Sequence, residues 1–214
     1  MAVNIIRRSP VTFDKPAVRT EERDNYTVVL EYEDQGAGPW LIDLSHRARW
    51  DLQERAIDEI QPFGAGVPDT PGRCAFADGM LINRMNRTQA SLWHLSGNRP
   101  DTPDGQSFTD VSDATVFLAL IGKDLALMLE KLTALDFFNA SNKAPFLLQG
   151  PLSHVPCQCV MLEKSNQRSG LLFTCSRGYA RDMVEGILGV GAEFGLRPAG
   201  EEAFQNWLNQ LSIG

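Results

Sequence analysis

Residues 115–122 read Thr-Val-Phe-Leu-Ala-Leu-Ile-Gly, and the segment 123–135 that follows carries apolar side chains at helical spacing. The first stretch contains the longest apolar run of the chain, and it predicts a strand that Gly122 turns into a helix. A second unit of the same plan follows at 170–175, where a strand leads into a helix from Arg177 to Val190 with Ser176 as its N-cap. Two such units indicate a split βαβ arrangement.

Other elements follow from short apolar or alternating runs that lie between turn residues. Asp78-Gly79 is the strongest hairpin signal in the chain. The expected further strands cover 40–44, 48–52, 73–77, 80–86, 90–95 and 157–162. The segment 54–61 predicts a short helix that Pro62 stops, 142–156 a loop, and 201–211 a last helix.

This order of elements predicts an α+β protein with antiparallel sheets. A polar stretch rich in Pro, Asp and Ser after residue 95 marks the boundary between two subdomains. We expect an extended N-terminal arm over residues 1–25, a first α+β subdomain over 26–100, a linker loop over 101–114, a second α+β subdomain over 115–200 and a C-terminal helix over 201–214.

The composition excludes several classes of protein. The 214 residues include 27 acidic and 20 basic side chains, and the resulting net charge of −7 argues against a nucleic-acid partner. No apolar run approaches the roughly 20 residues that span a bilayer, and the N-terminus lacks a signal-peptide core, so we expect a cytoplasmic protein without membrane contact. The 4 cysteines are too few for a disulfide scaffold.

Several short motifs resemble functional sites but lack the spacing that the chemistry requires. The glycine pairs at 64–66 and 189–191 do not open a helix, so they cannot aim amides at a phosphate. Cys157 and Cys159, with His154 nearby, have no second ligand pair for zinc, and we interpret the cysteines as core residues.

The Ser-His pairs at 45–46 and 153–154 would point to opposite faces of a strand, so neither forms a local catalytic dyad. We therefore predict no catalytic, cofactor-binding or metal residue in this chain, and we interpret the 3 histidines as structural or interface residues.

Four segments in register resemble the aminomethyltransferase-like proteins, which include the glycine-cleavage T protein and its folate-binding relatives. The segments are Ile-Asp-Leu-Ser-His at 42–46, Phe-Leu-Ala-Leu-Ile-Gly at 117–122, Gly-Leu-Leu-Phe-Thr-Cys at 170–175 and Gly-Leu-Arg-Pro-Ala-Gly at 195–200. They cover about residues 40–200, and the resemblance implies a folate-binding-domain fold of two ferredoxin-like βαβ subdomains.

The departures from that family concern its folate site. Gly79 and Met80 stand where the transferase has an acidic pair, with Asp78 one position too early. Arg168 stands where the transferase has the glutamate that binds the pterin. A carboxylate accepts paired hydrogen bonds from a pterin ring, whereas a guanidinium has donors only. The chain also ends where the transferase continues into a further β-domain.

A short version of this fold without the folate site resembles the gamma subunit of heterotetrameric sarcosine oxidase and the small subunit of N-methylglutamate dehydrogenase. The resemblance implies a non-catalytic assembly subunit of a complex that oxidatively demethylates N-methyl amino acids. FAD, FMN, NAD and tetrahydrofolate would be bound by partner subunits. The expected partners are a large folate-binding alpha-type subunit, an FAD-containing beta-type subunit and a small cysteine-rich, zinc-binding delta-type subunit.

Four aromatic side chains are candidates for contacts with those partners, because aromatic residues are enriched at interface cores. Each is equally compatible with a place in the core. The candidates are Trp40, Trp50, Phe63 and Trp93. The alternative function is a stand-alone folate-dependent aminomethyltransferase, for which Asp78 and Glu163 are the nearest candidate carboxylates.

Overall fold

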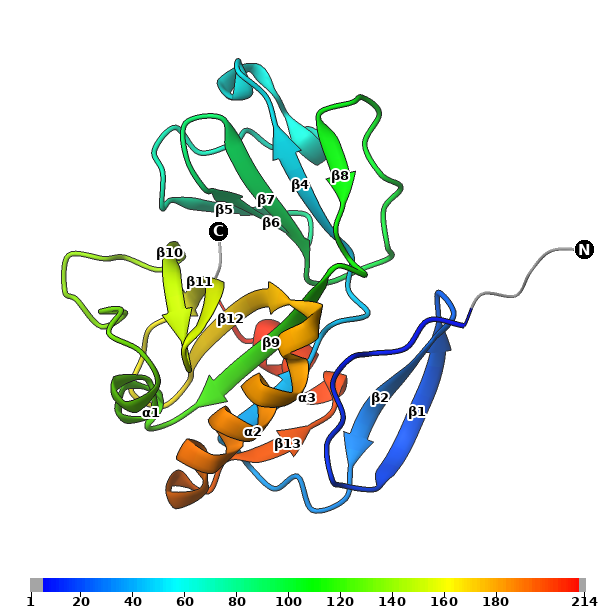
Figure 1. Ribbon diagram of the computed structural model, residues 1–214, viewed down its shortest axis with the longest axis vertical. Coiled ribbons are helices and arrows are strands. Elements are labelled where there is room, and N and C mark those ends of the chain that lie inside the picture. The colour runs from blue at the N-terminus through cyan, green and yellow to red at the C-terminus, as the bar shows by residue number, and fades with distance from the viewer. Residues whose placement is uncertain (1–5, 212–214) are drawn as a thin grey trace, which may run out of the picture.

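The six-stranded sheet is built around β9 (Thr115–Gly122), the apolar strand predicted near the middle of the chain (Figure 1). The computed structural model describes residues 6–211. In this sheet the strand order is β10-β11-β12-β9-β3-β13, and all neighbours are antiparallel except β13 and β3. The other strands are β3 (Trp40–Asp43), β10 (Phe146–Leu152), β11 (Val155–Glu163), β12 (Ser169–Ser176) and β13 (Arg197–Ala199).

The central strands form the split βαβ arrangement that the two strand–helix units predict. β12 lies between β9 and β11 and is antiparallel to both, so β9 and β11 run parallel. Helix α1 (Leu125–Leu132) follows β9, and α2 (Ala180–Gly191) follows β12. The prediction that Ser176 caps this helix is wrong, since a 3-10 turn at Arg177–Tyr179 precedes α2 and the Ser176 side chain makes no cap bond.

The five-stranded sheet has the order β5-β6-β7-β4-β8 and is antiparallel throughout. The predicted Asp78-Gly79 turn joins β5 to β6, with φ of 49° and 78° at the two residues. Both values are positive, as a tight hairpin turn between twisted strands requires. The strands are β4 (Arg49–Gln53), β5 (Cys74–Ala77), β6 (Met80–Arg84), β7 (Gln89–His94) and β8 (Phe108–Asp110).

The expected N-terminal arm is wrong for residues 17–23, which form a strand. β1 (Ala17–Arg23) and β2 (Tyr26–Tyr32) make an antiparallel hairpin that stands beside the six-stranded sheet (Figure 1). Almost every side chain of β1 is exposed, so its sequence has no apolar alternation to reveal a strand. Residues 1–5 of the expected arm, and 212–214 of the expected last helix, lie outside the described residues.

Several further elements differ from the prediction. The segment 54–61 contains only a 3-10 turn, Ile57–Glu59, and within the described residues the span 44–110 has no α-helix, so the first half is not an α+β subdomain. The expected linker contains β8, and the expected loop over 142–156 contains β10. β3 belongs to the sheet of the second half, so the two halves interlock instead of following one another along the chain.

The core lies in layers on both faces of the six-stranded sheet. Leu118, Leu120 and their neighbours pack under α1 and α2. Phe117 and Ile121 point to the other face, against Trp93 of the five-stranded sheet and against α3 (Glu201–Leu208). Because β9 is covered on both faces, its side chains are apolar without alternation. No helix in residues 6–211 combines the length and the apolar character that crossing a membrane requires.

Candidate functional site

A buried carboxylate at the start of α3 joins three distant parts of the chain. Glu201 is 2% exposed, and Arg23 of the hairpin donates to its two oxygens at 2.8 and 3.0 Å. His46 Nε2 donates to Oε1 at 2.9 Å, and Arg47 also donates to Oε1. Burial alone would raise the pKa of this carboxyl group, but the hydrogen bond and charge of His46 and the two arginine charges outweigh it and lower the pKa to about 2.

The Asp-Leu-Ser-His segment has a structural role at the end of β3. Asp43 accepts the Ser45 backbone N–H at 2.9 Å, and the Ser45 hydroxyl accepts the N–H of Phe117 at 3.2 Å. Ser45 is fully buried, and its neighbour His46 is bound to Glu201. The contacts of Ser45 and His46 within the described residues are thus structural, and the absence of a catalytic dyad stays a prediction.

The other two histidines lie at the end of a buried strand and in a turn. His94 is 3% exposed at the end of β7, and burial followed by the charge of Arg47 lowers its pKa to about 4. A histidine of this kind stays neutral near pH 7. Ser153 and His154 occupy the turn between β10 and β11, both at positive φ. Their positions are those of turn residues.

Three cysteines belong to the core under α1 and α2. Cys157 and Cys159 alternate along β11, and Cys175 lies on the neighbouring strand β12. The thiol pKa of Cys157 is raised to about 12, first by its contact with Cys159. The thiol pKa of Cys175 is raised as well, first by its hydrogen bond with Cys157 and then by burial. Within residues 6–211 no group of histidine, cysteine or acidic side chains is arranged to hold a metal ion.

The candidate interface aromatics fall into two groups. Trp50 and Trp93 are 0% and 1% exposed, so the prediction of a partner contact is wrong for both. They fill the two faces of the five-stranded sheet, where Trp93 packs on Phe117 with ring centres 5.1 Å apart. Phe63 is partly buried against Trp50 at 5.2 Å. Trp40 is half-buried and lines a groove.

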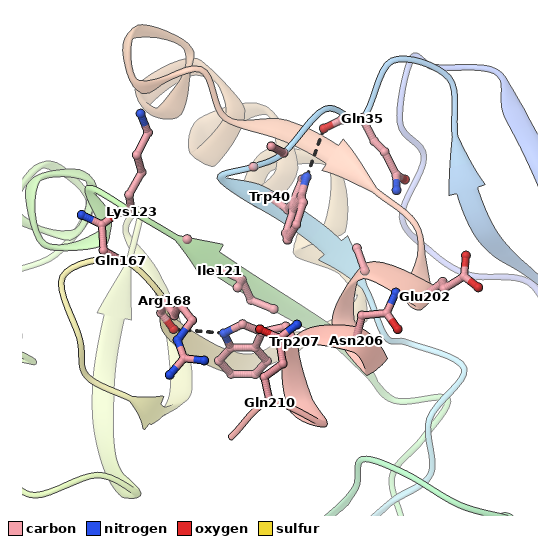
Figure 2. A pocket seen from close by; sticks show the side chains of 14 residues that line it. Gln35, Trp40, Ile121, Lys123, Gln167, Arg168, Glu202, Asn206, Trp207 and Gln210 are labelled. Carbon is pink, nitrogen blue, oxygen red and sulfur yellow. Dashed lines mark hydrogen bonds between the residues drawn. The ribbon is translucent and has the colours of Figure 1, made fainter. Parts of the chain in front are cut away.

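That groove, which we call the tryptophan groove, has a volume of about 610 Å³ (Figure 2). Trp40 and Trp207 lie across from one another in it, with Ile121 between them. Trp40 comes from the start of β3 and Trp207 from α3, so the groove joins two elements far apart in the sequence. Its size lies within the range of roughly 300–1,000 Å³ that is usual for ligand pockets.

Both indole N–H groups of the tryptophan groove are already bound. Trp40 Nε1 donates to the Gln35 carbonyl at 3.0 Å, and Trp207 Nε1 donates to the Arg168 carbonyl at 3.0 Å. The Trp207 ring also lies against Gly170, where a Cβ atom would come within 2.1 Å of Cζ2. The two rings are therefore held in place and present apolar surface to the groove.

The charges of the tryptophan groove are separated between its two ends. Lys123 and Arg168 lie at one end, exposed, and neither forms an ion pair with another described residue. Glu202 lies at the other end, where Arg19 of the hairpin pairs with it. The free charge of the groove is therefore positive.

The residues present do not fit a pterin. The side chain at position 168 is a guanidinium, which offers donors to a ring system that needs acceptors for its own N–H groups. Asp78 is exposed in the hairpin turn, and Glu163 ends β11; neither lines the groove. Glu202 is engaged by Arg19.

Sequence reasoning missed both Glu201 and Trp207. A signal for the first was present, since the pair of acids at 201–202 directly follows the Gly-Leu-Arg-Pro-Ala-Gly segment and begins a predicted helix. Trp207 carried no local signal, because its importance comes from Gly170, which is distant in the sequence.

Comparison with known proteins links the fold to a multisubunit enzyme. No family model matches the sequence, and no curated protein is significantly similar to it. Among solved structures, a chain of the heterotetrameric sarcosine oxidase from Corynebacterium sp. U-96, in complex with pyrrole 2-carboxylate, superimposes with a TM-score of 0.60 at 16% sequence identity. The match covers 75% of this chain and 88% of that chain. The resemblance seen in the sequence is thus confirmed at the level of the fold, which is that of a chain in a heterotetrameric sarcosine oxidase.

Proposed function

We propose that this chain is a non-catalytic, gamma-type assembly subunit of a heterotetrameric, flavin-dependent oxidase or dehydrogenase of N-methyl amino acids. The observation that carries the proposal is the match to a chain of heterotetrameric sarcosine oxidase, of which 88% is covered. A match of nearly the whole neighbouring chain supports a subunit of similar extent.

The chemistry of the described residues supports this role. The buried carboxylate of Glu201 is paired with Arg23, His46 and Arg47, so it serves the fold. The tryptophan groove presents Lys123 and Arg168, and its carboxylate Glu202 is paired with Arg19, whereas a pterin needs a free carboxylate to accept its hydrogen bonds. Both observations favour a chain that supports chemistry on its partners.

The proposal assigns the cofactors and the reaction to other subunits. FAD, FMN and NAD would lie on the alpha-type and beta-type chains, tetrahydrofolate on the alpha-type chain and zinc on the delta-type chain. The substrate would then be selected on another subunit, and the N-methyl group would leave as formaldehyde or as methylenetetrahydrofolate.

Co-expression with the products of neighbouring reading frames tests the assembly role. We expect one complex that contains this chain, an amine-oxidising flavoprotein, a large folate-type chain and a small cysteine-rich chain. A stable monomer with demethylating or aminomethyltransferase activity of its own would contradict the proposal.

Titration of the isolated chain with tetrahydrofolate tests the alternative, a stand-alone folate-dependent aminomethyltransferase. Because the groove lacks a free carboxylate among its lining residues, we expect no saturable binding at micromolar folate. Tight stoichiometric binding would favour the transferase and contradict the assembly role.

A further inference from the structure

We infer that the tryptophan groove is the docking site for an acidic segment of a partner subunit, one that inserts an aromatic or large apolar side chain between Trp40 and Trp207. The inference rests on the proposed function, because it needs partner chains. It adds a defined surface and a defined chemistry of the partner to that function.

The floor of the groove is suited to an inserted apolar side chain. The indoles of Trp40 and Trp207 are fixed by hydrogen bonds to backbone carbonyls, and Ile121 lies between them (Figure 2). Side chains that are already ordered lose little conformational entropy when a partner binds. Tryptophan and arginine are also the residues that most often dominate binding energy at protein interfaces.

The cationic end specifies an acidic partner. Lys123 and Arg168 carry the uncompensated positive charge of the groove on a chain whose net charge is −7. Figure 2 shows the two side chains on the same side of the groove with their charged ends pointing away from one another, so each can pair with a separate carboxylate of the segment, and no described acid pairs with either. A local positive site on a negative protein favours approach of an acidic segment at this place over the rest of the surface.

The rim of the groove offers groups for the backbone of such a segment. The side-chain amides of Gln167, Asn206 and Gln210 line it and make no hydrogen bond to other described residues. Each amide has both donor and acceptor atoms, so it can bind a peptide N–H or carbonyl. An apolar floor surrounded by polar side chains is the usual anatomy of a protein interface.

A charge-reversal experiment on the assembled complex tests the inference. The double variant Lys123→Glu/Arg168→Glu is compared with Lys143→Glu/Arg55→Glu, which changes two exposed cations outside the groove by the same total charge. We expect the groove variant to bind the partner chains at least about tenfold more weakly, and the control variant to bind as the wild type does. Circular dichroism establishes that both variants are folded.

A photo-crosslinker provides a second measurement, whose result is the identity of the contacting segment and not a binding affinity. Replacement of Gln167 by p-benzoylphenylalanine places the reactive group at the rim of the groove. In the wild-type background we expect a crosslink to a partner segment rich in aspartate or glutamate, identified by mass spectrometry.

The outcomes separate the inference from the proposed function. If the complex forms and the groove variant binds as tightly as the control, the inference is overturned and the assembly role stands. A crosslink to a segment without acidic residues overturns it as well. If the wild-type chain forms no complex, the assembly role fails and the inference fails with it.

Discussion

Replacing Glu201 by glutamine should destabilise the protein strongly, because it removes the charge but keeps the size of the side chain. The substitution leaves His46 and Arg47, both nearly buried, without a carboxylate, and it also removes the partner of Arg23. Loss of one member of a buried ion pair typically costs about 3–5 kcal/mol, since the remaining charges stay desolvated.

The pKa of Glu201 gives a similar estimate of the loss in free energy of unfolding. Its fall from 4.5 to about 2 on folding means that the charged form is favoured in the folded protein. At about 1.36 kcal/mol for each pKa unit, the carboxylate contributes roughly 3 kcal/mol at neutral pH. This is a large part of the roughly 5–15 kcal/mol by which a typical domain is stable.

The pH dependence has a defined sign. Because the folded-state pKa is below the unfolded value, the stabilisation is fully present above about pH 4.5 and is lost as the pH falls towards 2. We therefore expect the wild type and Glu201→Gln to differ most in free energy of unfolding at pH 7, and to converge below pH 4.5.

Urea unfolding at several pH values measures this difference, and Glu202→Gln is the matched control. Glu202 is the next residue of the same helix turn, so both variants lose a similar interaction with the helix dipole. Its side chain is 47% exposed, and its pair with Arg19 lies on the surface, so we expect a loss below about 1 kcal/mol. The reasoning is refuted if the two variants are equally stable at pH 7, or if the effect of Glu201→Gln does not shrink in acid.

Substitutions of glycine and arginine, and labelling of a buried thiol, test other parts of the structure. Gly170→Ala should lower the melting temperature by several degrees and alter the fluorescence of Trp207, since the new Cβ would lie 2.1 Å from the indole; Gly189→Ala, with free space around it, should be neutral or stabilising by up to about 1 kcal/mol. Arg49→Met should lower the free energy of unfolding in urea by about 3 kcal/mol. The guanidinium of Arg49, a residue that is 1% exposed, donates to the backbone carbonyls of Ser45, Arg47, Ser112 and Thr115, which would lose this partner. An unchanged urea midpoint would contradict that role. The Cys157 thiol, whose pKa is raised to about 12, should resist a thiol reagent at pH 8 until the protein is unfolded in guanidinium; rapid labelling of the native protein would show that the thiol is accessible.

Local sequence patterns predicted the parts of the fold that are stabilised by nearby residues. The run at 116–121 is apolar because β9 is buried on both faces, and Asp78-Gly79 adopts positive φ because the tight turn between β5 and β6 needs it. The same local reasoning was wrong at 17–23 and 146–152. Those strands pair with neighbours at the margins of sheets, and their exposed or mixed side chains carry no clear period.

For the candidate site too, the sequence predicted some features and missed others. The sequence indicated that Arg168 replaces an acid expected from the resemblance, and that Ser45 and His46 are not a catalytic pair. It could not show that Trp50 and Trp93 are buried, because a tryptophan is compatible with both a core and an interface.

The sequence by itself determined the apolar strands, the hairpin turn, the excess of acidic charge and the basic residue at position 168, since each of these depends on residue type or on short-range spacing. Only the tertiary structure decided that β3 belongs to the six-stranded sheet, that Glu201 joins the hairpin to α3, and that Trp40 and Trp207 form a groove. These features depend on contacts between residues far apart in the sequence, such as Trp40 with Ile121 and Arg23 with Glu201. Such contacts form through packing and charge pairing in the folded chain, so no short-range pattern in the sequence records them.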